Sequence, residues 1–159
     1  MSLILALYPN SRGLGFACVE MPSRLVEFGI VTVRPVNNER IRGRIEKFIG
    51  FFKPEIVVIR DSETGTPRDR RIALLIEDVK KLGQATGVPV YSYSRQQVKD
   101  VFEVFGEKTK YGIAHKIIKW FPELEDHAPR IRRPWMDEDY YMGIFDALAL
   151  AITHAYLTE

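Results

Sequence analysis

The segment that most constrains the fold is a run of four aliphatic residues, Ile56-Val57-Val58-Ile59, which lies between Pro54 and Arg60. This run is too short for a helix, and its unbroken apolar character is typical of a parallel strand that is covered on both faces. A second short apolar run, Leu3 to Leu7, ends in a turn rich in Pro, Asn and Gly, which predicts another buried strand. The chain is therefore expected to form a sheet between layers of helices.

The rest of the chain continues first as strands and then as alternating helices and strands. Gly15 to Glu20 and Leu25 to Val33 are rich in β-branched and aromatic residues, which predicts two more strands. Three antiparallel strands followed by strands that alternate with helices predict an α/β fold, with one mixed five-stranded sheet and helices on both faces. The remaining expected elements are a helix from Asn37 or Asn38 to Phe52, a helix over Ile72 to Leu82, a strand over Val88 to Tyr93, helices over Arg95 to Phe105 and Ile113 to Phe121, a loop over Glu123 to Trp135, and a last helix from near Asp137.

Composition narrows the class of protein. With 159 residues, 46% of them hydrophobic and 28% charged, the chain is expected to form a single domain over residues 1–159. One cysteine, Cys18, excludes an internal disulfide and a multi-cysteine zinc site, and it fits a reducing compartment, so we expect a cytoplasmic protein. No apolar segment approaches the length of a membrane span, and no secretory signal is recognised, so no membrane partner is expected. The net charge of +2 is too small to indicate nucleic acid by itself, so any basic patch must be local.

Five segments occur in the order and at the spacing of a known family. They are Ile4 to Gly15 with its glycine turn, Phe52 to Ile59, Leu82 to Val88, Arg95 to Lys99, and Asp146 to His154. Together they resemble the ribonuclease H-like fold and, within it, the Holliday-junction resolvases of the RuvC type, over nearly the whole chain. The resemblance implies a homodimer that acts on branched DNA.

The resemblance also implies a catalytic cluster of carboxylates that holds two divalent metal ions, Mg or Mn, at the carboxyl ends of the central strands. Its four positions fall on Tyr8, Arg60, Gly143 and Asp146, so only Asp146 is an acid. A tyrosine is not anionic near neutral pH, and an arginine adds a fixed positive charge where metal ions would lie. The site is expected to be degenerate and to hold no cofactor, and an ion pair between Asp146 and Arg60 is an alternative to metal binding by Asp146.

Replacement ligands are the other possibility. Asp61 follows the fourth strand, but it reaches the site only if that strand ends or bulges there. Asp139 precedes Asp146 by two helical turns, about 10 Å along a helix axis. Glu63 and Glu138 are more distant candidates. If these acids assemble, Asp146, Asp61 and Asp139 are the catalytic residues of a Mg- or Mn-dependent, structure-selective endonuclease.

Ten basic residues, here called the basic rim, fall on three segments that border the catalytic face of this fold. Brought together, they would bind phosphates in a salt-sensitive and largely sequence-independent way. Nearby aromatic residues such as Tyr111, Trp120 and Trp135 either stack on bases or anchor the fold. The basic rim consists of Arg68, Arg70, Arg71, Arg95, Lys99, Lys108, Lys110, Arg130, Arg132 and Arg133.

Three functions remain open from the sequence. The leading hypothesis is a nucleic-acid-binding relative of the junction resolvases, with lost or strongly impaired nuclease activity and a preference for branched or structured DNA. The second is a metal-dependent endonuclease with relocated carboxylates. The third is a protein-interaction or assembly scaffold that binds no nucleic acid.

Overall fold

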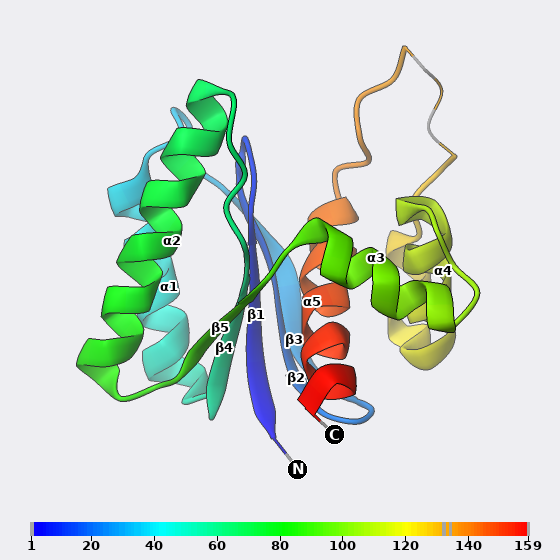
Figure 1. The fold of residues 1–159 in the computed structure, drawn as a ribbon, viewed down its shortest axis with the longest axis horizontal. Coiled ribbons are helices and arrows are strands. Elements are labelled where there is room, and N and C mark those ends of the chain that lie inside the picture. The colour runs from blue at the N-terminus through cyan, green and yellow to red at the C-terminus, as the bar shows by residue number, and fades with distance from the viewer. Residues whose placement is uncertain (1, 132, 134, 159) are drawn as a thin grey trace.

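The computed structural model describes residues 2–131, 133 and 135–158, and within them a five-stranded sheet has the order β3-β2-β1-β4-β5 (Figure 1). The strands β1, β2 and β3 pair antiparallel, and β4 and β5 continue the sheet parallel to β1. The mixed sheet expected from the sequence is confirmed. The strands are β1 (Leu3–Pro9), β2 (Gly13–Glu20), β3 (Arg24–Thr32), β4 (Ile56–Arg60) and β5 (Val90–Tyr93).

Helices cover both faces of this sheet. Helices α1 and α2 lie on one face, and α5 lies on the other, with α3 and α4 packed outside it (Figure 1). No helix in the described part of the chain is long and apolar enough to cross a membrane. The helices are α1 (Asn38–Phe52), α2 (Pro67–Thr86), α3 (Arg95–Val104), α4 (Lys110–Trp120), the 3-10 helix η1 (Pro122–His127) and α5 (Met142–Thr158).

The alternation of side chains along β1 builds two separate cores. Leu5 and Leu7 pack with α1 and α2, whereas Ile4 and Ala6 face α5. Because both faces of the central strands are buried, these strands read as continuous apolar runs. Helix α5 is buried around most of its circumference, and Asp146 is its one acidic residue.

Helix α5 approaches β2 closely enough to require glycine on both sides. A Cβ atom on Gly15 would lie 2.2 Å from the carbonyl oxygen of Gly143. Conversely, a Cβ atom on Gly143 would lie 3.1 Å from the Cα of Gly15 and from the Cδ1 of Ile30. This contact fixes the first turn of α5 against the sheet and brings Asp146, three residues later, near the end of β1.

Three expectations about the second half of the chain were wrong. The last helix begins at Met142 and not near Asp137, because the Asp139 carboxylate accepts a hydrogen bond from the Tyr141 amide (3.0 Å) and forms a turn before the helix. The expected loop after residue 122 begins with η1, which is anchored by the buried Leu124. Helix α4 begins at Lys110 and not at Ile113, because the Thr109 hydroxyl caps it through the amide of Gly112 (3.0 Å).

Candidate functional site

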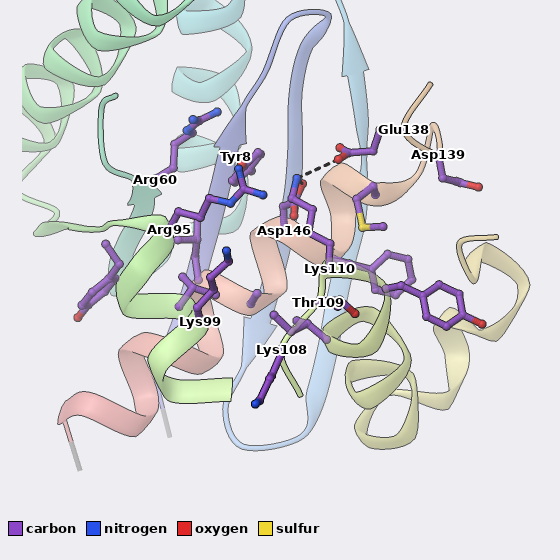
Figure 2. Close-up of a pocket in the computed structure, with 18 of the residues that line it drawn as sticks. Tyr8, Arg60, Arg95, Lys99, Lys108, Thr109, Lys110, Glu138, Asp139 and Asp146 are labelled. Atoms are coloured by element: carbon purple, nitrogen blue, oxygen red, sulfur yellow. Dashed lines mark hydrogen bonds and ion pairs between the residues drawn. The ribbon is translucent and has the colours of Figure 1, made fainter. Parts of the chain in front are cut away.

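A cleft of about 410 Å³ opens at the carboxyl ends of β1, β4 and β5, between α3, α4 and the start of α5 (Figure 2). Its centre is polar, and one of its sides is apolar. The charged residues that line it are Arg60, Asp61, Glu63, Arg95, Lys99, Lys108, Lys110, Arg130, Glu138, Asp139 and Asp146.

Lys110 is at the centre of this cleft. The Thr109 cap places Lys110 in the first turn of α4, from which its side chain enters the cleft. Its Nζ donates to Glu138 Oε2 at 3.0 Å and to Asp146 Oδ2 at 3.3 Å. It also lies 5.5 Å from the centre of the Tyr8 ring. The ammonium therefore bridges two carboxylates beside an aromatic face, and Asp146 contributes a side chain that is only 11% exposed.

The guanidinium of Arg60 also lies over the Tyr8 ring. Its guanidinium carbon is 4.7 Å from the centre of the Tyr8 ring, and its Nη1 donates to the Pro9 carbonyl at 2.9 Å. Its ion-pair partner in the described structure is Glu63, at 3.8 Å. The ion pair between Arg60 and Asp146 that the sequence suggested is therefore wrong: Lys110 pairs with Asp146, while the Pro9 carbonyl and Glu63 hold Arg60.

Burial and neighbouring charges decide the ionisation of this centre. Burial raises the pKa of Asp146 to about 6, although the ammonium of Lys110 opposes the shift. For Lys110, burial lowers the pKa, but Asp146, Tyr8 and Glu138 outweigh it, so the net pKa is raised. Burial, reinforced by the Asp146 charge, raises the pKa of the Tyr8 phenol. At neutral pH the centre therefore holds a charged lysine and a neutral tyrosine.

The other acids proposed as replacement ligands line the cleft, but protein groups already contact them. Asp61 Oδ1 accepts from the amide of Ser62 at 2.8 Å, and Asp139 Oδ2 lies 3.9 Å from Arg130 Nε. Within residues 2–131, 133 and 135–158, no three His, Cys, Asp or Glu side chains are grouped so that they could hold a metal ion. A two-metal site needs carboxylates around ions that lie about 4 Å apart. The donor set of this cleft does not fit such a pair of ions.

Members of the basic rim occupy different environments. Arg95, Lys99, Lys108, Lys110 and Arg130 line the cleft, and Arg68 lines an adjoining hollow of about 420 Å³. The side chains of Arg95, Lys99 and Lys108 are exposed, and within the described part of the chain they make no hydrogen bond or ion pair. These three side chains are therefore available to an anionic ligand.

The remaining basic residues lie elsewhere. Arg71 donates to the Asn10 carbonyl at 2.7 Å and to Asn38 Oδ1 at 3.0 Å, and so joins the β1–β2 turn to α1. Arg70 and Arg133 are exposed and line neither cavity. Arg132 lies outside the described residues. Their contact with nucleic acid stays a prediction.

The aromatic residues also divide between the two expected roles. Tyr111 lines the cleft, and Trp135 is exposed. Trp120 packs against Phe105, with ring centres 5.1 Å apart, and so anchors α4 to α3.

The arrangement at the centre of the cleft differs from the expectation. The sequence places Lys110 in the basic rim and Glu138 among the more distant ligand candidates, and it does not predict that both pair through the lysine with Asp146. Lys110 and Asp146 are 36 residues apart, and no helical or strand period connects them. The one local signal was an acid in an otherwise apolar helix, which requires a partner without identifying it.

Searches against known proteins support the resemblance seen in the sequence, although no family model matches the chain. The curated crossover junction endodeoxyribonuclease RuvC of Pasteurella multocida is 30% identical, with 98% of this chain and 80% of that protein covered. The protein of the same name from Mannheimia succiniciproducens is 28% identical, with 100% and 78% covered.

Solved structures agree on the fold. The structure of T. thermophilus RuvC in complex with a Holliday junction substrate has a TM-score of 0.72 at 22% identity, over 99% of this chain and 95% of that chain. The likeness confirms the expected ribonuclease H-like fold. Together with the 30% identical relative, it shows that the chain belongs to the RuvC family of crossover junction endodeoxyribonucleases.

Proposed function

We propose that this chain binds branched DNA through the cleft and the basic rim, and that it has lost, or nearly lost, the ability to hydrolyse DNA. The relatives are named crossover junction endodeoxyribonucleases, and one structural neighbour holds a Holliday junction. The proposal combines the ligand of those proteins with the altered charges of this cleft.

The observation that carries the proposal is the asymmetry between acids and bases in the cleft. Each of the five acids that line it is engaged by a group of the protein, whereas Arg95, Lys99 and Lys108 have no such partner within the described residues. The pairs are Asp146 and Glu138 with Lys110, Glu63 with Arg60, Asp139 with Arg130, and Asp61 with the Ser62 amide.

This asymmetry favours phosphate over metal ions. A hydrated divalent ion would have to displace Lys110 from two carboxylates, and Arg60 would repel it from the side of Tyr8. A phosphodiester, in contrast, meets three free cations on α3 and on the turn before α4. Binding is therefore expected without any divalent metal, and no cofactor is required; Mg or Mn would be needed only if activity remained.

The test measures binding and cleavage on the same DNA. Fluorescence anisotropy would compare a four-way junction, a linear duplex and a single strand, in EDTA and in Mg²⁺ or Mn²⁺, across a salt series. We expect the junction to bind most tightly and equally well in EDTA, without nicking in either metal.

Two outcomes would contradict the proposal. Metal-dependent nicking that is abolished in Asp146→Asn would identify an endonuclease with relocated carboxylates. If the protein bound none of the three DNAs at low salt, the result would favour the third hypothesis, a protein-interaction or assembly scaffold.

The quaternary structure belongs to the same proposal. Phe51 on α1 and Leu74 on α2 are 81% and 60% exposed, which leaves apolar surface on these helices that a second copy would bury. We propose that the domain over residues 1–159 forms a homodimer that acts in the cytoplasm. Sedimentation of Phe51→Glu beside the unmodified chain tests the dimer.

A further inference from the structure

Trp135 is exposed to an extent that packing within the domain does not explain. It is 80% exposed, and among the described large apolar residues only Phe51 is exposed to the same degree. Ile131, four residues earlier in the chain, is 65% exposed. Tryptophan has one of the largest apolar surfaces of any side chain, so a partner that covers Trp135 gains a large favourable burial.

The segment that carries Trp135 projects from the domain but is attached to it at both ends. It spans residues 130–138, described except for 132 and 134, and is here called the Trp135 turn. Before it, the carbonyl of the buried Pro129 lies 3.4 Å from His115 Nε2. After it, the Tyr140 hydroxyl lies 3.2 Å from Thr32 Oγ1. Figure 1 shows the segment extending away from the first turn of α5.

The Trp135 turn stands at the rim of the cleft, because Arg130 at its start and Glu138 at its end both line the cleft. The side chain of Arg130 is 77% exposed, and Arg133 is also exposed. Proteins that bind DNA without regard to sequence combine an aromatic ring, which stacks on a base, with cations that contact phosphates. The turn therefore adds a stacking group to a surface that is already suited to phosphate.

We propose that Trp135 stacks on a base pair at the branch point of a DNA junction that is bound at the cleft, and that this contact selects branched over linear DNA. Inside a linear duplex each base pair is stacked on both sides, so a ring can enter only after two pairs separate, which costs free energy. At a branch point the arms diverge, and this separation costs less. The inference rests on the proposed function, because the cleft holds the DNA beside the turn.

The first test measures affinity in EDTA, which excludes metal-dependent cleavage. Fluorescence anisotropy would compare a four-way junction with a linear blunt-ended duplex. We expect Trp135→Ala to weaken junction binding about tenfold, the order of one stacked base, and to change duplex binding less than about twofold. Unchanged junction affinity, or equal weakening on both DNAs, would overturn the inference.

Two further variants separate stacking from a general apolar contact. Trp135→Phe keeps a flat ring and is expected to retain most of the junction affinity. Trp135→Leu keeps apolar surface without a ring and is expected to behave like Trp135→Ala. If Trp135→Leu bound the junction as tightly as the unmodified protein, the contact would not be stacking and the inference would be wrong.

Tyr156 provides a matched control for the loss of an exposed aromatic ring. It is 43% exposed and lies near the end of α5, about 20 Å along the helix from its start at the cleft. Tyr156→Ala is expected to leave the affinity for the junction unchanged. Equal weakening by Tyr156→Ala and Trp135→Ala would show that the effect is not specific to the Trp135 turn.

Fluorescence tests the contact directly, because the chain contains two tryptophans. Trp120→Phe leaves Trp135 as the single indole and keeps an aromatic ring near Phe105. In this variant we expect the junction to quench the emission of Trp135 and to shield it from acrylamide, and the linear duplex to do neither. Unchanged emission and shielding at saturating junction would overturn the inference, as would quenching by anionic phospholipid vesicles but not by the junction.

Failure of the inference and failure of the proposed function give different results. If the proposed function is wrong, the unmodified protein binds no junction. If only the inference is wrong, the unmodified protein binds the junction and Trp135→Ala binds it equally well.

Discussion

Lys110 places its ammonium 3.3 Å from the carboxylate of Asp146, and the same nitrogen lies 3.0 Å from Glu138. Asp146 is the single acid that remains at the positions where the family resemblance expects metal ligands. A protein cation thus occupies the space between two carboxylates that would otherwise attract a cation from solution. This pairing within the chain supports the proposal that the cleft binds its ligand without a metal ion.

Removal of this lysine is predicted to create a weak metal site. In Lys110→Ala, Asp146 and Glu138 lose their shared partner, and two carboxylates with water are sufficient for weak Mn²⁺ binding, with a Kd of about 1 mM. Electron paramagnetic resonance of free Mn²⁺ measures the bound fraction. Lys108→Ala is the control, because Lys108 has no acidic partner in the described residues. Equal Mn²⁺ binding by the unmodified protein and by Lys110→Ala would show that the lysine does not block the site.

The pH dependence of the free energy of unfolding is predicted to reflect the titration of Asp146. Burial raises its pKa from 3.8 to about 6, so between these values the folded chain holds a proton that the unfolded chain releases. The free energy of unfolding therefore falls as the pH rises from about 4 to about 6, and this contribution is constant above about pH 7.

The measurement compares urea unfolding of the unmodified chain and of Asp146→Asn at pH 4, 5, 6 and 7. Relative to the variant, the unmodified chain is expected to lose about 2 to 3 kcal/mol across this range. Other titrating groups, including His154, are common to both proteins and cancel in the difference. If the unmodified chain instead became more stable relative to Asp146→Asn as the pH rises, Lys110 would stabilise the Asp146 carboxylate more than burial destabilises it.

The three cations without partners are predicted to control the salt dependence of DNA binding. Each phosphate contact contributes roughly 0.9 to the slope of log affinity against log salt on duplex DNA. The variant with Arg95→Gln, Lys99→Gln and Lys108→Gln is therefore expected to reduce the slope by up to about 2.7 and to weaken binding at low salt most. Lys47→Gln, an exposed change on α1 across the sheet, is the control. An unchanged slope in the triple variant would show that residues other than these three make the phosphate contacts.

The sequence predicted the sheet well because its strands are buried on both faces. The unbroken apolar runs over β4 and β1 record that burial directly, and the helix caps at Asn37 and Gly87 are local signals. The predicted starts of two helices were wrong because a single side chain sets each of them: Asp139 before α5 and Thr109 before α4.

The site was predictable only in part, because its contacts are tertiary. Asp146 is conspicuous as an acid in an apolar helix, yet the choice between Arg60 and Lys110 as its partner depends on how α4 packs against α5. Long basic side chains are the hardest to assign from sequence. Arg71 resembles its neighbours in the basic rim, but it bonds to the Asn10 carbonyl, a group that no local pattern marks.

The close approach of α5 to β2 is predicted to make Gly15 indispensable. A Cβ atom there would lie 2.2 Å from the Gly143 carbonyl oxygen, and both partners are backbone, so neither can move without shifting the helix or the strand. Gly15→Ala is expected to destabilise the protein by about 3 kcal/mol, the upper part of the usual range for overpacking. For a chain of this size, that corresponds to a decrease in Tm of roughly 6 to 12 °C.

The matched control is Gly50→Ala within α1, where an added Cβ meets nothing within 4 Å. It is expected to stabilise the protein by about 0.5 to 1 kcal/mol, because alanine restricts the unfolded chain and favours the helix. Calorimetric melting of both variants measures the contrast. Because Asp146 follows Gly143 on the same helix, Gly15→Ala should also shift the carboxylate away from Lys110 and reduce the pH dependence expected from Asp146. If Gly15→Ala melts at the same temperature as the unmodified chain, the first turn of α5 is not held against β2 as the structure has it.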